Sequence, residues 1–147
     1  TMAVLPTEPG NQHEEVISPL RGLDNVILTP HIGGSTEEAQ ENIGREVADK
    51  IARFLRAGTT RSAVNFPEIA YLPKQVRHRI LHIHRNEPGV IAQMNGAFAA
   101  EGLNIVAQQL QTQADIGYAM TDVDTPITDA LMTQLRGSPA TIRCDYI

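Results

Sequence analysis

The order of strand-like and helix-like patterns in the second half of this sequence constrains the fold more than any other feature. Residues 76–85, VRHRILHIHR, alternate between apolar and polar as a half-buried strand does. The patterns that follow are a helix from Pro88 to Gly102, β-rich runs at 103–112 and 116–124, a helix from Thr125 to Gly137 and a last β-rich run at 140–147. The order β-α-β-β-α-β predicts a ferredoxin-like α+β domain: a four-stranded antiparallel sheet with two helices on one face.

The first half predicts one long helix and little else. Ser35 and Glu38 have the spacing of a capping box. Apolar residues then recur every three to four positions up to Gly58, where a glycine typically ends a helix. Before it, Asn25–Thr29 predicts a short buried strand. One helix and one strand cannot bury a core, so we expect 1–58 to be the end of a larger α/β domain, 59–75 a linker and 76–147 a second domain.

Composition excludes several classes of protein. The net charge is −5 and no cluster of Lys or Arg follows a helix face, which argues against a nucleic-acid partner. No apolar run approaches the roughly 18 residues of a membrane span, so we expect no membrane partner. Cys144 is the single cysteine, which excludes an intrachain disulfide and favours the reducing cytoplasm.

A histidine lies on a stiff turn in LTPHIGGSTEEAQENIG, residues 28–44. Pro30 restricts the backbone before His31, and Gly33 and Gly34 allow the main chain to come close to a ligand. Histidine titrates near neutral pH and can take the hydroxyl proton that leaves when a 2-hydroxy acid is oxidised. A solvated surface histidine is the plainer interpretation of such a residue, and only the joint pattern favours catalysis.

Several motifs together resemble a known family. PTEP (6–9), the His31 loop, SAVNFPE (62–68), HIHRNEPGV (82–90) and AEGLNIVAQQLQT (100–112) resemble the C-terminal portion of bacterial D-3-phosphoglycerate dehydrogenases, members of the D-2-hydroxyacid dehydrogenase family. The βαββαβ unit resembles an ACT domain, a small-molecule regulatory module. The resemblance covers essentially the whole chain and implies the tail of a Rossmann-like nucleotide-binding and substrate domain pair followed by an ACT domain.

The resemblance implies an NAD-dependent oxidation of 3-phospho-D-glycerate, the first step of L-serine biosynthesis. His31 is then the acid/base, Glu8 its carboxylate partner, and His31, Gly33 and Gly34 contact the NAD cofactor. The sequence departs from the family where Ala3-Val4-Leu5 replaces an Asp-Val-Phe run, and GxGxxG is absent. We therefore expect the segment alone to be inactive, as a fragment of a homotetrameric parent enzyme.

For the ACT domain, the resemblance implies L-serine as a feedback inhibitor bound by His84, Asn86 and Asn104 between two copies of the domain. Imidazole and amide groups suit a free amino acid, and the helix start after Pro88 offers N–H groups to its carboxylate. Pairing two sheets along an exposed edge would form this homodimer. A different class of function remains open: a stand-alone amino-acid-binding ACT module with a vestigial leader.

His82 and His84 raise a further alternative, because positions i and i+2 on a strand share one face and could hold a metal ion. His78 is on the same face, and Cys144 offers one thiol, but neither completes an evident ligand set. We therefore predict no metal site. The histidines are instead expected to be solvated, to be hydrogen-bonded within the protein or to contact a ligand.

Overall fold

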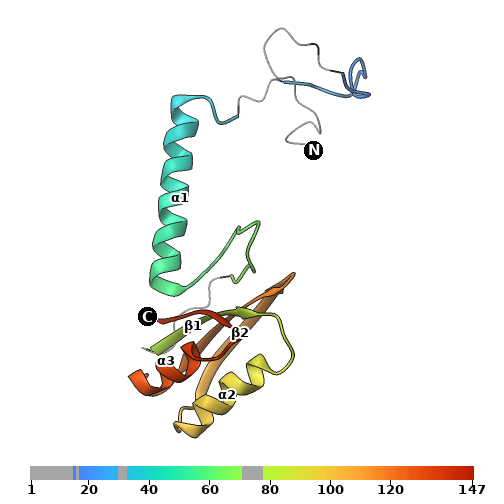
Figure 1. Cartoon of the computed structure of the whole chain (residues 1–147). Helices are drawn as coiled ribbons and strands as arrows, with labels where there is room; N and C mark the ends of the chain where they lie inside the picture. Colours follow the sequence, from blue (N-terminus) through green and yellow to red (C-terminus); the bar gives the residue numbers. More distant parts are fainter. Residues whose placement is uncertain (1–14, 16, 30–32, 71–77) are drawn as a thin grey trace. The chain divides into compact units, whose positions relative to one another are not determined.

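The computed structural model describes residues 15, 17–29, 33–70 and 78–147 (Figure 1). The chain divides into two compact units, residues 1–46 and 47–147. The elements are α1 (Glu37–Ala57), β1 (His78–Arg85), α2 (Val90–Ala100), β2 (Ile105–Gln113), β3 (Ile116–Val123), α3 (Asp129–Arg136) and β4 (Thr141–Tyr146). No helix among the described residues is long and apolar enough to cross a membrane.

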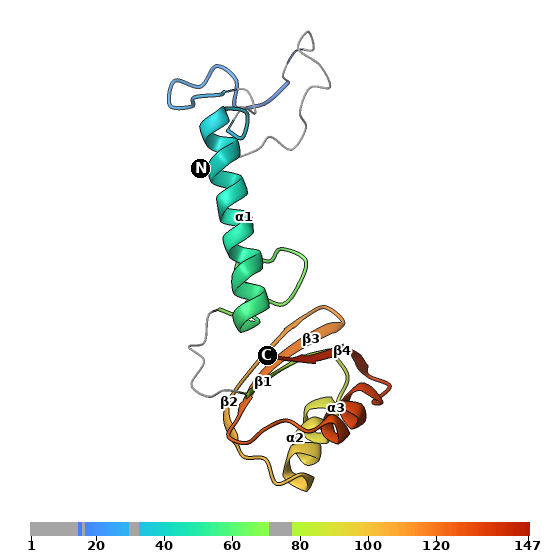
Figure 2. The same ribbon diagram turned by 90° about the vertical axis from the view of Figure 1, so that its left-hand side faces the viewer.

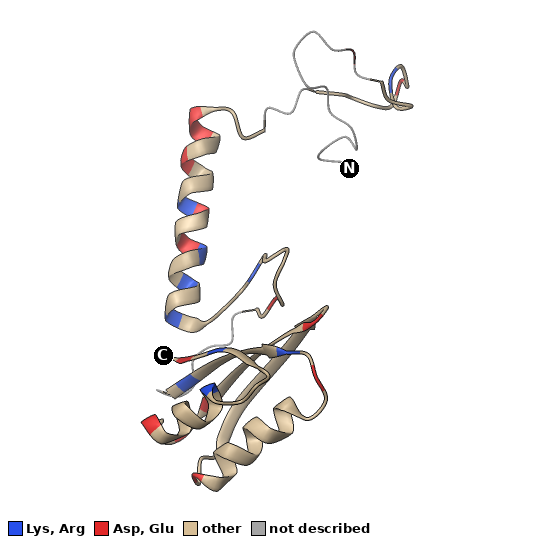
Figure 3. Cartoon of the chain, viewed as in Figure 1, with Lys and Arg blue, Asp and Glu red and all other residues tan. Residues whose placement is uncertain are grey.

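Helix α1 is present as the sequence predicts, but a different residue caps it. The hydroxyl of Thr36, not that of Ser35, accepts from the N–H of Ala39 at 3.1 Å. Acidic residues at its start and Arg56 in its last turn complement the helix dipole (Figure 3). Its apolar residues Ile43, Val47, Ile51 and Leu55 are between 46% and 64% exposed. The helix therefore carries an apolar stripe that is about half exposed.

The sheet has the predicted topology, with strand order β2-β3-β1-β4 and every neighbouring pair antiparallel. The two central strands are β1 and β3, and β2 and β4 are the edges. Figures 1 and 2 show α2 and α3 on the same face of the sheet. Helix α2 connects β1 to β2, and α3 connects β3 to β4. In each case the two connected strands are parallel and one other strand lies between them, which gives the split βαβ, ferredoxin-like arrangement.

The main core lies between the sheet and the two helices. Phe98 and Met94 of α2 and Leu131 of α3 pack there against Ile80 and Ala119 of the central strands. The α3 helix begins later than Thr125, because Thr128 is its N-cap and accepts from the N–H of Leu131 at 3.2 Å. Helix α2 likewise begins after Pro88, with Gly89 as N-cap in a left-handed conformation.

The opposite face of the central strands is covered by the segment that follows α1. Ile69 packs there against Leu81, Tyr118 and Met120, with Phe66 beside them. Thr59 and Thr60 of the same segment bond to the backbone of Ile69 and Pro67, which folds the segment onto itself. The stretch interpreted from sequence as a linker therefore contributes a second small core to the sheet.

A buried ion pair fixes the end of α1 to this face. The guanidinium of Arg79 contacts both carboxylate oxygens of Asp122, at 2.6 and 2.7 Å, and donates to the carbonyl of Ala57 at 2.8 Å. Tyr118 donates its hydroxyl to the carbonyl of Gly58 at 2.6 Å. The side chains of Arg79 and Asp122 are 0% and 1% exposed, so each buried charge needs the other as its counter-charge.

One predicted element is wrong. Asn25–Thr29 is not a strand: the residues are without regular structure, and the side chain of Ile27 is 91% exposed. A strand needs a neighbour to satisfy its backbone, and among the described residues none pairs with this run. A short apolar pattern is therefore not enough to predict a strand.

Candidate functional site

Two buried histidines lie at the end of β1. His82 and His84 are each 2% exposed, and their rings stack with centroids 5.2 Å apart. Because side chains alternate along a strand, both histidines lie on the same face of the sheet as Ile80, which is the face that α2 and α3 cover. A bulge in the β1–β4 pairing falls between Ile83 and His84, which re-aims the strand end. Buried imidazoles usually have hydrogen-bond partners, so any ring nitrogen here that lacks one is a candidate for binding a ligand.

A short relay fixes the tautomer of His82. Thr141 donates its hydroxyl hydrogen to the carbonyl of Leu135 at 2.7 Å, so its oxygen must accept from Nε2 of His82, also at 2.7 Å. Burial, with a further contribution from the proximity of His84, lowers the pKa of His82 to about 4. The ring is therefore neutral near pH 7, and its Nδ1 is an acceptor for which the structure provides no partner.

His84 is fixed in the opposite tautomer. Its Nδ1 lies 2.8 Å from the carbonyl of Arg85, and a carbonyl can only accept, so Nδ1 carries the hydrogen. Its Nε2 is buried and has no hydrogen-bond partner in the structure. A buried polar atom without a partner carries a cost in free energy, and a bound ligand would remove that cost.

The two predicted asparagines lie at opposite ends of the sheet. Asn86 follows β1, and its side chain donates to the carbonyl of Ala114 in the β2–β3 turn at 3.1 Å. Asn104 precedes β2. Its backbone N–H donates to the Oδ1 carboxylate oxygen of Asp124, just past the end of β3, and its carbonyl accepts from the N–H of Asp124. Because β3 is eight residues long, the two asparagines are separated by roughly 25 Å within one chain. One chain therefore brings His84 and Asn86 together but not Asn104.

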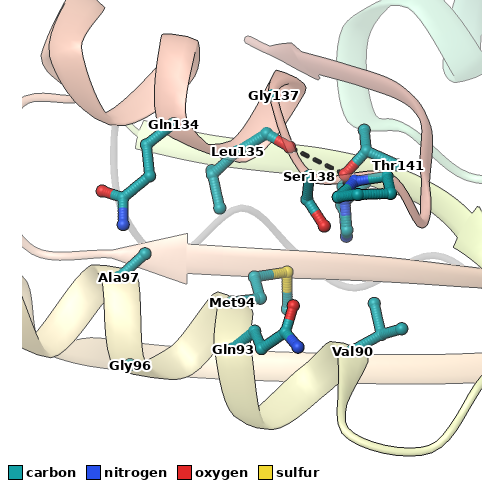
Figure 4. A pocket seen from close by; sticks show the side chains of 12 residues that line it. Val90, Gln93, Met94, Gly96, Ala97, Gln134, Leu135, Gly137, Ser138 and Thr141 are labelled. Carbon is teal, nitrogen blue, oxygen red and sulfur yellow. Dashed lines mark hydrogen bonds between the residues drawn. The ribbon is translucent and has the colours of Figure 1, made fainter.

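A surface hollow of about 520 Å³ lies between α2 and α3, beside the relay. Figure 4 shows Val90 and Met94 of α2 pointing toward Leu135 of α3, with the bond from Thr141 to the carbonyl of Leu135 behind them. His82 and Thr141 both line the hollow, and none of its lining residues is Asp, Glu, Lys or Arg. The His82 relay thus lies in the wall of an uncharged depression.

The other predicted site residues are described in part. Glu8 and His31 lie outside the described residues. Gly33 and Gly34 form a turn before α1, and a side-chain carbon added at Gly33 would meet no atom within 4 Å. In the described part of the chain no three His, Cys, Asp or Glu residues are grouped as metal ligands. Burial raises the pKa of the Cys144 thiol to about 11, so that thiol is an inert core residue.

Sequence reasoning missed two features of this domain, the Arg79–Asp122 pair and the position of Gly117 opposite His84. A signal existed for the first: Arg79 and Asp122 each lie in a strand predicted to be central or half-buried, and unpaired charges are almost never fully buried. For the second, no pattern in the sequence indicates that Gly117 lies opposite His84. That relation depends on the strand register, which the sequence alone leaves open.

Comparison with known proteins gives consistent matches. The family of AHAS small subunit-like ACT domains matches residues 80–143. The chain is 52% identical over 140 residues to D-3-phosphoglycerate dehydrogenase of Haemophilus influenzae, and 49% identical over 142 residues to that of Escherichia coli K12. Each match covers 95% of this chain but 34% of the relative, so the chain spans about a third of the length of these curated relatives.

A solved structure with a similar fold is the ACT domain from GTP pyrophosphokinase of Chlorobium tepidum. The TM-score is 0.43 at 19% identity, and the match covers 48% of this chain and 95% of that domain.

Proposed function

We propose that the chain is the effector-binding part of an NAD-dependent dehydrogenase and that its effector is L-serine, because it is about half identical to D-3-phosphoglycerate dehydrogenases over 95% of its length and matches an ACT domain family. Serine would be the end product of the pathway that the parent enzyme begins, so its binding is feedback inhibition. The parent reaction is oxidation of 3-phospho-D-glycerate to 3-phosphohydroxypyruvate, in a cytoplasmic homotetramer.

In that reaction NAD accepts the hydride, and His31 takes the hydroxyl proton of the substrate. Glu8 supports the charged form of the imidazole. Gly33 and Gly34 have no side chains and would let the main chain come close to the cofactor. These assignments rest on the sequence motif, and the serine site rests on the described residues.

The observation that carries the serine proposal is the unpartnered Nε2 of His84. With Nδ1 committed to the carbonyl of Arg85, Nε2 accepts a hydrogen bond from the ammonium or hydroxyl group of an amino acid. The start of α2 lies six residues further along the chain, and its N-cap Gly89 makes no side-chain cap bond. Its free N–H groups can receive the carboxylate of the same ligand.

The second copy of the chain docks on the β2 edge. Exposed edges pair readily unless charges or prolines prevent it. β2 is nine residues long and contains no charged residue, whereas β4 is six residues long and carries Arg143 and Asp145. Figure 3 shows this contrast, since β2 and α2 carry no charged residue along their length. Charge and length therefore favour β2 as the pairing edge.

Antiparallel pairing of two β2 strands would complete the site. Asn104 lies at the start of β2, and Asn86 is bonded to the turn at the end of β2. A two-fold axis through the middle of β2 brings the start of one strand beside the end of the other. Asn104 of one copy would then face His84 and Asn86 of its partner, and serine between them would contact both chains.

Calorimetric titration of the 147-residue chain with L-serine tests this proposal. We expect saturable binding by L-serine and weaker binding of glycine and L-alanine, because neither carries the hydroxyl group. Asn104→Ala removes an exposed amide and no core packing, so it should weaken serine binding about tenfold and leave the melting temperature unchanged. Sedimentation should show serine favouring the dimer. A chain that stays monomeric in saturating serine would contradict the shared site.

A further inference from the structure

Gly117 of β3 lies directly opposite His84 of β1 in the sheet. A side-chain carbon built on Gly117 would lie 2.2 Å from Cε1 of His84, 2.6 Å from Nε2 and 2.9 Å from Nδ1. Such distances are far inside van der Waals contact, so any other residue at position 117 would occupy the place of the imidazole. Gly117 has no positive φ, so its backbone conformation alone does not require glycine.

The ring of His84 is held from three directions. Gly117 provides the space in which it lies, the ring of His82 stacks on it at an interplanar angle of 25°, and the carbonyl of Arg85 accepts from Nδ1. A ring held in this way has one orientation and one tautomer. Glycine in a strand interior weakens the strand and often marks a close approach of other atoms, and here the approaching group is the imidazole.

We infer that Gly117 is a positioning residue of the effector site: by having no side chain, it leaves the space in which the His84 imidazole lies against β3, with Nδ1 bonded to the Arg85 carbonyl and Nε2 left without a partner in the chain. The inference rests on the proposed function for the identity of the ligand, and on the geometry alone for the position of the ring. Position 117 therefore decides whether an ACT domain of this sequence can use His84 to recognise an amino acid.

The test compares Gly117→Ala with Gly96→Ala in the full 147-residue chain. Gly96 lies in the interior of α2, where an added carbon meets no atom within 4 Å, so Gly96→Ala controls for the substitution itself. Nitrogen chemical shifts of the His84 imidazole, measured without ligand, report its tautomer and surroundings. We expect Gly117→Ala to move these shifts and to weaken L-serine binding about tenfold or more, and Gly96→Ala to change neither.

A double-mutant cycle separates positioning from a general loss of structure. If Gly117 acts through His84, adding Gly117→Ala to His84→Ala should weaken serine binding no further. The added methyl group would then fill the space left by the ring, so the double variant should melt above Gly117→Ala alone. Equal losses of binding from Gly117→Ala with and without His84 would overturn the inference, as would unchanged imidazole shifts.

The two proposals fail in different ways. If the unaltered chain does not bind L-serine, the effector assignment is wrong, but the imidazole shifts of Gly117→Ala still report whether position 117 places the ring. If the chain binds serine and Gly117→Ala binds it equally well, the effector assignment stands and the positioning role is wrong.

Discussion

Replacing Asp122 with alanine is expected to lower the free energy of unfolding by about 3–5 kcal/mol, because it leaves the Arg79 guanidinium buried without its counter-charge. The two side chains are 0% and 1% exposed, and two of their hydrogen bonds join them directly. The same arginine also donates to the carbonyl of Ala57. Losing the pair should therefore also loosen the contact between the end of α1 and the sheet.

Urea unfolding of the 147-residue chain measures this effect, with the midpoint and slope fitted separately. The matched control replaces both charges at once, Arg79→Met with Asp122→Leu, because exchanging a buried pair for apolar residues of similar size is often neutral or stabilising. Asp122→Ala and the double variant should thus differ by several kcal/mol. If Asp122→Ala unfolds at the same urea concentration as the unaltered chain, the ion pair does not stabilise the fold.

In the full-length dehydrogenase that contains this segment, His31→Ala should lower kcat by roughly two to four orders of magnitude, because it removes the group that takes the substrate proton. Coenzyme binding should change little. Glu8→Gln should lower kcat by a smaller factor and shift the pH profile of kcat/KM, because the imidazole remains but its charged form is less stabilised. The segment alone should show no turnover.

Steady-state kinetics over a range of pH, with NAD affinity measured separately, provides the comparison. His78→Ala is a suitable control because His78 is half-buried at the start of β1 and has no proposed part in catalysis. Near-normal turnover by His31→Ala would remove this histidine from the mechanism.

The fold of the second half could be predicted from sequence because its signals are local and mutually consistent. Alternation in VRHRILHIHR and the helical pattern from Thr125 to Gly137 each indicate one type of element, and their order permits few topologies. The Asn25–Thr29 run fails because strand formation depends on a partner, which a short apolar pattern does not supply. At α1, Ser35 and Thr36 are both capping residue types, and the backbone decides that Thr36 is used.

The residue types of the proposed site come from the sequence, but their geometry does not. His84 and Asn86 could be named from their motif, yet the unpartnered Nε2 depends on the Arg85 carbonyl and on the register that places Gly117 opposite. Residues 57–70 cover the face of the sheet opposite α2 and α3. This covering depends on contacts between positions far apart in sequence, such as Tyr118 and Gly58. Contacts of that kind leave no periodic pattern.

The most direct test of the shared site is to mix two variants that each bind L-serine poorly. Asn104→Ala and His84→Ala chains, each binding L-serine poorly, should regain tight sites when they form mixed dimers, because each mixed dimer has one site with both residues intact. With equal amounts and random pairing, titration should recover about a quarter of the sites of the unaltered chain. If the mixture binds no more serine than the separate variants, Asn104 and His84 do not meet across two chains.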